Sequence, residues 1–256
     1  MASNSVLSEQ QEQIKQRFRE DVGYWQPSFD PVLRIDPEFF ERYREWVSFS
    51  FTSDVLDPKT KEFILIAAYS QVTHLHRDGI DRHVSRAFDE GATVSEVLEV
   101  LQIASCLGMH SYMIGAKILD EKKELSDAFD QDRLDDILDE FAEKRGYRPD
   151  WWGPYIAPAP EYFQTYLEYS SHPWLNGSLD PKIREFLYIA IDSTPAHLLE
   201  EGIDGHMDNA IELGATAEEL AEVLQLTSVL ALDTMLQGVP SLVTEAEKRG
   251  LLNESE

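Results

Sequence analysis

The chain has little positive charge and almost no cysteine. Its 256 residues carry 22 Lys and Arg against 48 Asp and Glu, for a formal net charge of −26. Nucleic acids and anionic membrane surfaces are bound mainly through Lys and Arg, so we expect neither as a partner. The single cysteine, Cys106, excludes an intrachain disulfide, a dithiol pair and any multi-cysteine metal site.

Long hydrophobic runs are missing as well. No window approaches 18 uninterrupted apolar residues, and the first 20 residues hold no apolar stretch, so we expect neither a membrane span nor a signal peptide. Hydrophobic residues still make up 43% of the chain, enough to bury a sizeable core. The expected location is the cytoplasm.

Several common catalytic motifs are absent too. The sequence has no G-x-G-x-x-G, no phosphate-binding G-x-x-x-x-G-K, no G-x-S-x-G, no H-E-x-x-H and no C-x-x-C. Nucleotide binding, serine hydrolase chemistry and dithiol redox chemistry therefore lack their usual residues.

What the chain does have is an internal duplication. A shift of 123 residues aligns residues 56–113 with 179–236 without a gap and with 26 identities in 58 positions. A period of this length is that of a small domain and is too long for a solenoid unit. We predict two homologous domains, residues 1–125 and 126–256, which we call the first and the second repeat.

Helix signals recur in both repeats. Pro58 favours a helix start, Gly79 is expected to end that helix, and Gly91 is expected to close the next one. Thr93 and Glu96 form a capping box for a third helix. The matching positions of the second repeat are Pro181, Gly202, Gly214, Thr216 and Glu219. No alternating apolar–polar runs joined by a tight turn are present, so we predict an all-α fold.

Histidines are concentrated in one segment of each repeat, in the pattern H-x-x-x-x-G-x-x-x-H. Its members are His74, Gly79 and His83 in the first repeat, and His197, Gly202 and His206 in the second. Histidine is the usual general acid or base near neutral pH, and the first repeat adds His76 and His110. A buried histidine with a purely structural role is the alternative for His83.

A glutamate accompanies the histidines. On a continuous helix from Pro58, at ~100° per residue, Glu62 and His76 would share one face, where Glu62 could orient a histidine or exchange protons with it. The second repeat keeps Glu185 but has Leu199 in place of the histidine. A favourable interaction with the helix dipole is the alternative reading of both glutamates.

The first repeat also has Arg77, Arg82 and Arg86 close to its histidines. In so acidic a chain this cluster could hold a substrate carboxylate, although a solvated face balanced by nearby aspartates is an alternative. On a helix, His74 and His76 would point in nearly opposite directions, so one metal ion could not use both. Cys106 lies in an apolar run and is expected to be a core residue.

The duplicated segment resembles the carboxymuconolactone decarboxylase family over about 60 residues in each repeat. The motifs are LDPKTKEF, His83-x-x-x-Ala87-x-x-x-Gly91 and Glu96-x-x-Glu99-Val-Leu, with LDPKIREF and the same pattern from His206 in the second repeat. The resemblance implies an all-α fold of the alkylhydroperoxidase-D-like type and a homo-oligomer, with a trimer favoured. The peroxidase branch of this fold uses C-x-x-C-x-x-x-H. Those cysteine positions hold His76 and Gly79 here, so dithiol peroxidase chemistry is not expected.

These patterns lead to a functional hypothesis: a cofactor-independent, decarboxylase-like lyase or isomerase acting on a small carboxylated ring or lactone. His83 would be the general acid or base, with Glu62 and His76 as its catalytic partners. Substrate contacts would come from His74, Arg82, Arg86 and His110. No metal or cofactor is expected.

We expect the first repeat to carry the site, because it keeps the bases and cations. The equivalents Glu185, His197 and His206 would then form a degenerate second site. The alternative is that the second repeat carries the working site, with Asp192 and Asp233 as its working carboxylates. Two other classes stay as alternatives: a metal-dependent enzyme using His74, His83 and Glu62, and a non-catalytic protein that binds a small ligand or acts as a scaffold.

Overall fold

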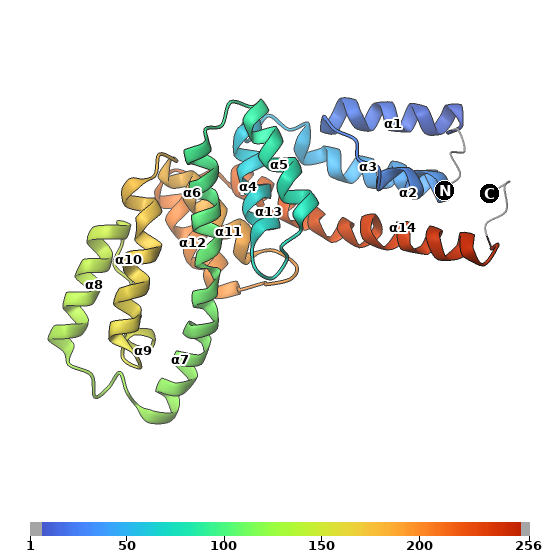
Figure 1. Ribbon diagram of the computed structural model, residues 1–256. Helices are drawn as coiled ribbons and strands as arrows, with labels where there is room; N and C mark the ends of the chain where they lie inside the picture. Colours follow the sequence, from blue (N-terminus) through green and yellow to red (C-terminus); the bar gives the residue numbers. More distant parts are fainter. Residues whose placement is uncertain (1–6, 252–256) are drawn as a thin grey trace.

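The structure, a computed structural model, describes residues 7–251, and every regular element within them is a helix, which confirms the predicted fold class (Figure 1). The first six residues of the opening segment, which we expect not to be a signal peptide, lie outside this range. The first repeat contributes α1 (Glu9–Val22), α2 (Phe29–Ile35), α3 (Pro37–Phe51), α4 (Pro58–Ser70), α5 (Arg77–Asp89), α6 (Val94–Ser105), η1 (Cys106–Gly108) and α7 (Met109–Lys123). The second contributes α8 (Gln131–Arg145), α9 (Gly153–Ile156), α10 (Pro160–Asn176), α11 (Pro181–Asp192), α12 (Glu200–Glu212), α13 (Ala217–Ser228), η2 (Val229–Leu232) and α14 (Asp233–Lys248).

The helix starts follow the capping signals of the sequence. Asp57 caps α4 through its side chain, and Thr93 with Glu96 completes the capping box of α6. α13 begins with the same box in the second repeat. Gly91, which follows α5, has φ of 81°, in the left-handed region that glycine adopts without steric cost. Local sequence chemistry therefore accounts for where these helices begin and how α5 ends.

The predicted extent of α4 is wrong. The helix ends at Ser70, well before Gly79, so Glu62 and His76 do not share a helix face. His74 and His76 lie instead in the turn between α4 and α5, and Gly79 lies in the first turn of α5. A Cβ at Gly79 would overlap the ring of Tyr69, so glycine is needed there for close packing and does not break a helix.

The turn after α4 uses a leucine in a glycine-like conformation. Leu75 has φ of 42°, and the next residue donates its backbone N–H to the Tyr69 carbonyl at 3.0 Å. The second repeat makes the same turn: Leu198 has φ of 50°, and Leu199 donates to the Asp192 carbonyl at 2.9 Å. Non-glycine residues rarely adopt positive φ, so the sequence carries no glycine signal for this helix end.

Helices α4, α6, α11 and α13 from both repeats form the central core. Two buried ion pairs cross between the repeats: Lys61 with Glu222 at 3.1 Å and Arg184 with Glu99 at 2.7 Å. Lys61 and Arg184 are 123 residues apart, and so are the two glutamates. Reciprocal contacts of this kind are those of a two-fold symmetric interface.

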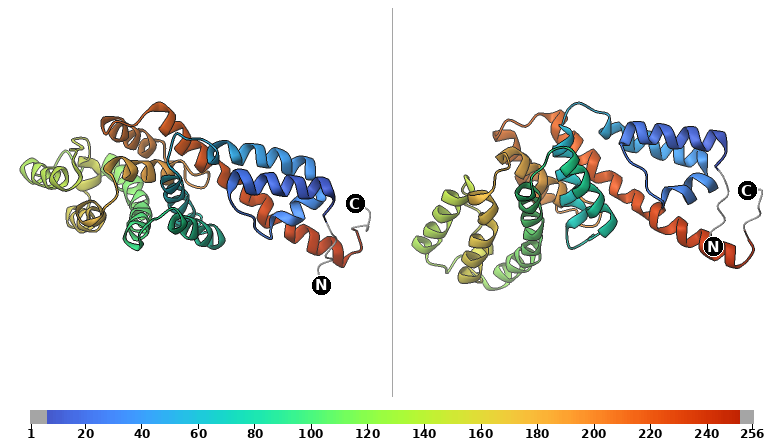
Figure 2. Two further views of the ribbon diagram at one scale, coloured as in Figure 1. Left: turned by 90° about the horizontal axis from the view of Figure 1, so that it is seen from above. Right: turned by 45° about the horizontal axis from the view of Figure 1, so that its top comes forward.

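Two wings extend from this core in opposite directions (Figures 1 and 2). In one wing, α1, α2 and α3 pack on α14, around a core that includes Phe18, Phe40 and Leu236. In the other, α8, α9 and α10 pack on α7, around Met109, Phe141 and Phe163. Each wing thus joins three helices of one repeat to the last helix of the other.

Two continuous helical stretches, Val94–Lys123 and Ala217–Lys248, are long and apolar enough to cross a membrane by length and composition. Polar residues interrupt both stretches, so neither is the uninterrupted apolar run by which the sequence would predict a membrane span. Core helices pass the same test, and α6 and α13, the first parts of these stretches, contribute to the central core. They are weak evidence for a membrane protein.

Candidate functional site

Each repeat contains a histidine paired with a buried glutamate. In the first, Nδ1 of His83 on α5 lies 2.7 Å from Oε2 of Glu62 on α4. In the second, Nδ1 of His206 on α12 lies 2.7 Å from Oε2 of Glu185 on α11. An ionised carboxylate only accepts hydrogen bonds, so Nδ1 donates in both pairs. Nε2 is then the ring nitrogen that can exchange a proton.

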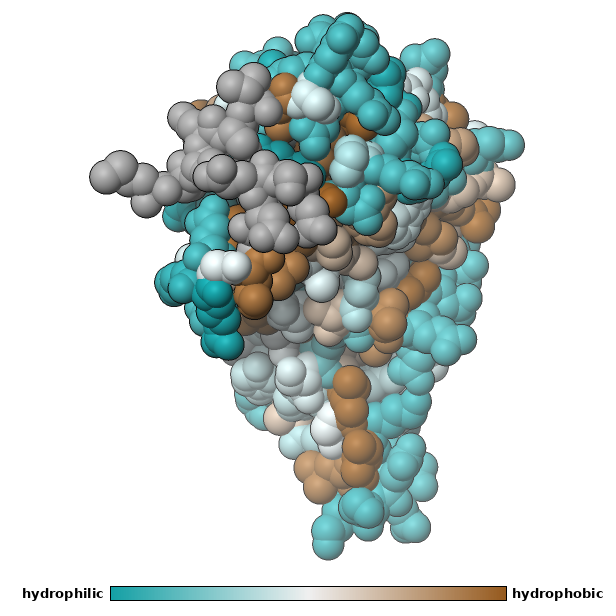
Figure 3. All heavy atoms as spheres, turned by 90° about the vertical axis from the view of Figure 1, so that its right-hand side faces the viewer, coloured by the Kyte–Doolittle hydropathy of each residue, from teal (hydrophilic) through white to brown (hydrophobic). Residues whose placement is uncertain are grey.

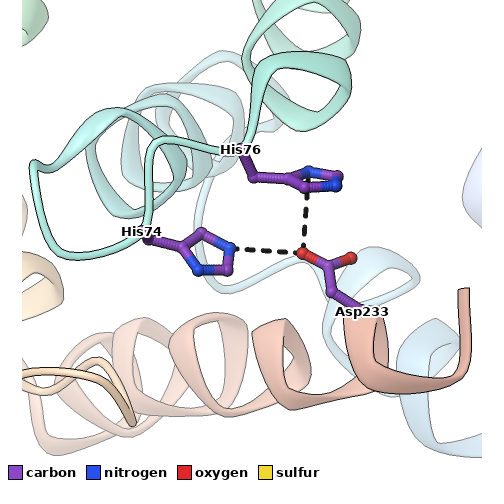
Figure 4. A group of neighbouring side chains, drawn as sticks. All are labelled: His74, His76 and Asp233. Atoms are coloured by element: carbon purple, nitrogen blue, oxygen red, sulfur yellow. Dashed lines mark hydrogen bonds and ion pairs between the residues drawn. The ribbon is translucent and has the colours of Figure 1, made fainter. Parts of the chain in front are cut away.

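Two residues lie in the site of the opposite repeat from the one expected from the sequence. His110, expected in the site of the first repeat, lies in that of the second, where its Nδ1 is 2.9 Å from Nε2 of His197. Its counterpart Asp233 lies in the first site, with Oδ2 at 3.2 Å from Nε2 of His74 and 3.6 Å from Nδ1 of His76 (Figure 4). The exchange arises because α7 and α14, which carry these residues, each reach into the other repeat's site.

The first site holds an ion pair between Arg86 and Glu62. Arg86 donates from Nε to Oε1 of Glu62 at 2.7 Å. Burial would raise the pKa of Glu62, but the hydrogen bond from His83 and the charge of Arg86 outweigh it and hold that pKa below its usual value. Burial lowers the pKa of His83. Arg77 is exposed and pairs with Asp81, away from this group.

The first site also has almost no free space. Its void measures about 20 Å³, room for about one water molecule. Tyr69 stacks on His83 with ring centroids 5.2 Å apart, and the Arg82 guanidinium lies 4.9 Å from the centroid of Tyr24. Apart from His110, the first-repeat residues predicted for catalysis and binding therefore gather in one place, but among residues 7–251 no substrate-sized cavity accompanies them.

The second site opens into a cavity of about 600 Å³. Gly205 and Asn209 line it where the first repeat has the long side chains of Arg82 and Arg86. His206 faces this cavity with Tyr188 stacked on it, at a centroid distance of 4.5 Å and an interplanar angle of 10°. A volume of this size is typical of small-molecule binding sites.

A buried arginine without an acidic partner lines the same cavity. Arg145, at the end of α8, is 7% exposed and has a Trp174 ring 4.7 Å from its guanidinium. It donates from Nη1 to the Ser170 carbonyl at 3.3 Å, while its Nε has no hydrogen-bond partner in the described part of the chain. Within residues 7–251 no carboxylate pairs with it. Its counterpart in the first repeat is Val22, and it lies far from the histidines in the sequence, so no sequence pattern marks it as a site residue.

Asp192 is the most isolated carboxylate of the second site. It is 1% exposed, and among the residues that the structure describes neither of its oxygens has a hydrogen-bond partner. Its Oδ1 lies 3.5 Å from Nδ1 of His110 and 3.7 Å from Nε2 of His197. Burial raises the pKa of Asp192 to about 7 and, with the nearby His197, lowers that of His110 to about 4.

Two groups within the described residues have the ligand spacing of a metal site: His74, His76 and Asp233, and His110, Asp192 and His197. Neither is the set of His74, His83 and Glu62 considered from the sequence, because His83 and Glu62 hydrogen-bond to each other. His74 and His76 can approach one carboxylate because they lie beyond the end of α4.

Cys106 lies in the cavity wall but is 5% exposed. Burial raises the pKa of its thiol, which disfavours the thiolate that a nucleophilic cysteine needs. Its buried position agrees with the core role predicted for it.

The paired helices and glutamate–histidine sites define an all-helical protein of the alkylhydroperoxidase-D-like type. The sequence profile of the Carboxymuconolactone decarboxylase family matches residues 160–238, which span most of the second repeat. A solved structure from Burkholderia xenovorans LB400, provisionally named a gamma-carboxymuconolactone decarboxylase subunit, is 35% identical with a TM-score of 0.87. The match covers 94% of this chain and 98% of that one. The chain therefore belongs to the carboxymuconolactone decarboxylase family. No protein of curated function matches it.

Proposed function

We propose that the protein is a decarboxylase-like lyase that acts on a small carboxylated ring or lactone in the cavity of the second repeat. The observation that carries this proposal is Arg145, a buried cation that lines the cavity and has no carboxylate partner within residues 7–251. Leaving a buried charge unpaired is costly, and an anionic ligand relieves that cost. A guanidinium binds a carboxylate through two parallel hydrogen bonds.

His206 is the proton-transfer group of this proposal. Glu185 accepts from its Nδ1 and so fixes the tautomer that leaves Nε2 free to take or deliver a proton. Decarboxylation breaks the C–C bond to a carboxylate, releases that group as CO2 and leaves the electron pair on the other carbon, which then takes up a proton from His206. Family membership and the name of the Burkholderia xenovorans relative support this class of reaction.

The proposal moves the working site to the second repeat. Glu62, His76 and His83 form the closed counterpart, together with His74, Arg82 and Arg86. His110 and His197 belong to the working site with Glu185 and His206. The sequence left the second repeat as an alternative if Asp192 and Asp233 are its working carboxylates. Asp192 lies in this site, but Asp233 lies in the first site.

A screen of small carboxylates tests the proposal. Mono-, di- and tricarboxylated rings and lactones are added to the metal-free protein, and the thermal midpoint is followed, with calorimetry and product analysis for compounds that bind. At least one is expected to bind the wild type and to bind Arg145→Gln ~10-fold or more weakly. His206→Asn is the matched variant: it should retain binding and lose turnover. If no carboxylate binds, or if binding is unchanged in Arg145→Gln, the proposal fails.

The protein is further proposed to be a cytoplasmic homo-oligomer, with a trimer favoured. The relative's name calls that protein a subunit, which supports association. The wing of α1–α3 and α14 shows hydrophobic patches on a largely hydrophilic surface (Figure 3), and Trp46 and Phe49 on α3 are 49% and 67% exposed. Light scattering at micromolar concentration tests this, and a 29.3 kDa particle would contradict it.

A further inference from the structure

The second site contains three potential ligand atoms at the spacing of a metal centre. Nδ1 of His110 and Nε2 of His197 are 2.9 Å apart, and Oδ1 of Asp192 lies 3.5 and 3.7 Å from them. Ligand bonds of about 2.0–2.2 Å in tetrahedral or octahedral geometry place neighbouring ligand atoms about 3 to 3.6 Å apart. The three atoms can therefore reach one ion with small adjustments.

Asp192 lacks the partners that a buried carboxylate needs. Both of its oxygens are buried and have no hydrogen bond to any residue of the described range 7–251, although two imidazoles lie close by. Gly202 leaves the space that Asp192 occupies, because a Cβ there would overlap Oδ2. The fold thus makes room for this carboxylate, and a cation would compensate its burial.

From this geometry we infer that His110, Asp192 and His197 bind a divalent first-row transition metal ion beside the cavity. Two imidazole nitrogens and one carboxylate oxygen suit ions such as Zn²⁺ and Fe²⁺. His110 also lines the cavity, so an ion held there would be accessible from it. This inference goes beyond the proposed function and does not depend on it.

The first site provides an internal control, because its own two histidines and one aspartate are already engaged (Figure 4). His76 accepts the Gly79 backbone N–H at its Nδ1, 3.1 Å away, and its Nε2 lies 2.7 Å from Nε2 of Gln237. Oδ1 of Asp233 accepts from the Tyr69 hydroxyl at 3.5 Å. An ion there would have to displace these contacts. In the second site an ion would displace the hydrogen bond between Nδ1 of His110 and Nε2 of His197, but within residues 7–251 the oxygens of Asp192 have no hydrogen bond to lose.

The test is a titration of the full-length protein, stripped of metal with a chelator, with Zn²⁺ alone by calorimetry and with Co²⁺ alone by visible absorption. We expect one ion per chain and Co²⁺ bands typical of nitrogen and oxygen ligands. Asp192→Asn and His110→Gln should each weaken binding by ~10-fold or more, because each removes a ligand. Asp233→Asn, the matched change in the first site, should leave affinity and stoichiometry unchanged.

Two results would overturn the inference: no stoichiometric binding of Zn²⁺ or Co²⁺, or binding that survives Asp192→Asn and is lost in Asp233→Asn. Circular dichroism checks the fold of each variant, and His110→Gln decides the question if Asp192→Asn does not fold. Because the carboxylate screen uses metal-free protein, failure of the metal site leaves the lyase proposal standing, and the reverse also holds.

Discussion

The two repeats use one scaffold to build a closed site and an open one. Both keep the glutamate–histidine pair at 2.7 Å, the leucine turn before it and the capping boxes around it. The void beside His83 nevertheless measures about 20 Å³, and the cavity beside His206 about 600 Å³. Both repeats therefore keep the glutamate–histidine pair, but within the described residues only the second has a cavity beside it that is large enough for a substrate.

The difference in space comes from a few side chains. The first repeat has Tyr69, Arg82 and Arg86 where the second has Asp192, Gly205 and Asn209. The three larger groups fill their site with an aromatic stack, a cation over aromatic rings and an ion pair to Glu62. From the sequence, the basic residues of the first repeat were the reason to expect the working site there. In the structure, the arginines among them fill the space that a substrate would need.

The largest difference between the repeats should appear in catalysis. His206→Ala should lower turnover of the carboxylate found in the screen by ~10²-fold or more, the usual contribution of a general acid or base. His83→Ala should change turnover by less than about threefold, because no substrate-sized cavity adjoins it. Steady-state kinetics on the two correctly folded variants makes the comparison. Equal losses would show that both sites work or that the histidine is structural in both.

A second comparison exchanges the filling residue between the repeats. Gly205→Arg gives the second site the arginine that the first has at position 82, and a Cβ at Gly205 meets no atom within 4 Å. The added side chain should occupy the cavity and weaken carboxylate binding by ~10-fold or more. Arg82→Gly, the reverse change, should leave binding unchanged. Calorimetry measures both, and undiminished binding by Gly205→Arg would place the ligand elsewhere.

The matched glycines Gly79 and Gly202 should differ in their tolerance of a methyl group. In Gly79→Ala the new Cβ meets the Tyr69 ring, which is held against His83, so we expect a loss of about 1–3 kcal/mol in the free energy of unfolding. In Gly202→Ala it meets the carboxylate end of Asp192, which can move more easily. Because alanine also favours the helix by about 1 kcal/mol, this variant should stay within about 1 kcal/mol of the wild type. Urea unfolding ranks the two, and a larger loss for Gly202→Ala would contradict this account.

The smallest expected effect is on pH dependence. Burial lowers the pKa of His83, so below about 6.5 the unfolded chain binds this proton more readily than the folded protein. The free energy of unfolding should therefore fall as pH drops from about 6.5 toward the lowered pKa, and His83→Gln should reduce this fall. Urea unfolding at several pH values between 5 and 7 measures the slope. An unchanged slope in His83→Gln would show that other groups cause it.

Local chemistry made much of the fold predictable. Pro58, Thr93 and their counterparts Pro181 and Thr216 were sufficient to predict the starts of α4, α6, α11 and α13, and Gly91 predicted the end of α5. The lack of alternating apolar–polar runs predicted the fold class. The end of α4 was not predictable in this way, because Leu75 takes the left-handed conformation and no glycine marks the position.

The candidate site was less predictable, because its residues meet only through tertiary packing. The sequence associated Glu62 with His83, but it could not show that α7 carries His110 into the second site and α14 carries Asp233 into the first. Arg145 lacks a polar counterpart in the first repeat, and no sequence pattern reports the volume of a cavity.

The placement of His110 and Asp233 has a consequence for how the chain can change by mutation. In a homodimer of one repeat, every substitution alters both sites at once, so filling one site would close the other as well. In a fused chain the matched positions of the two repeats are encoded separately. Substitutions can therefore fill one site while the cavity of the other stays open. Because each site borrows a residue from the opposite repeat, neither repeat can be deleted without removing a part of both.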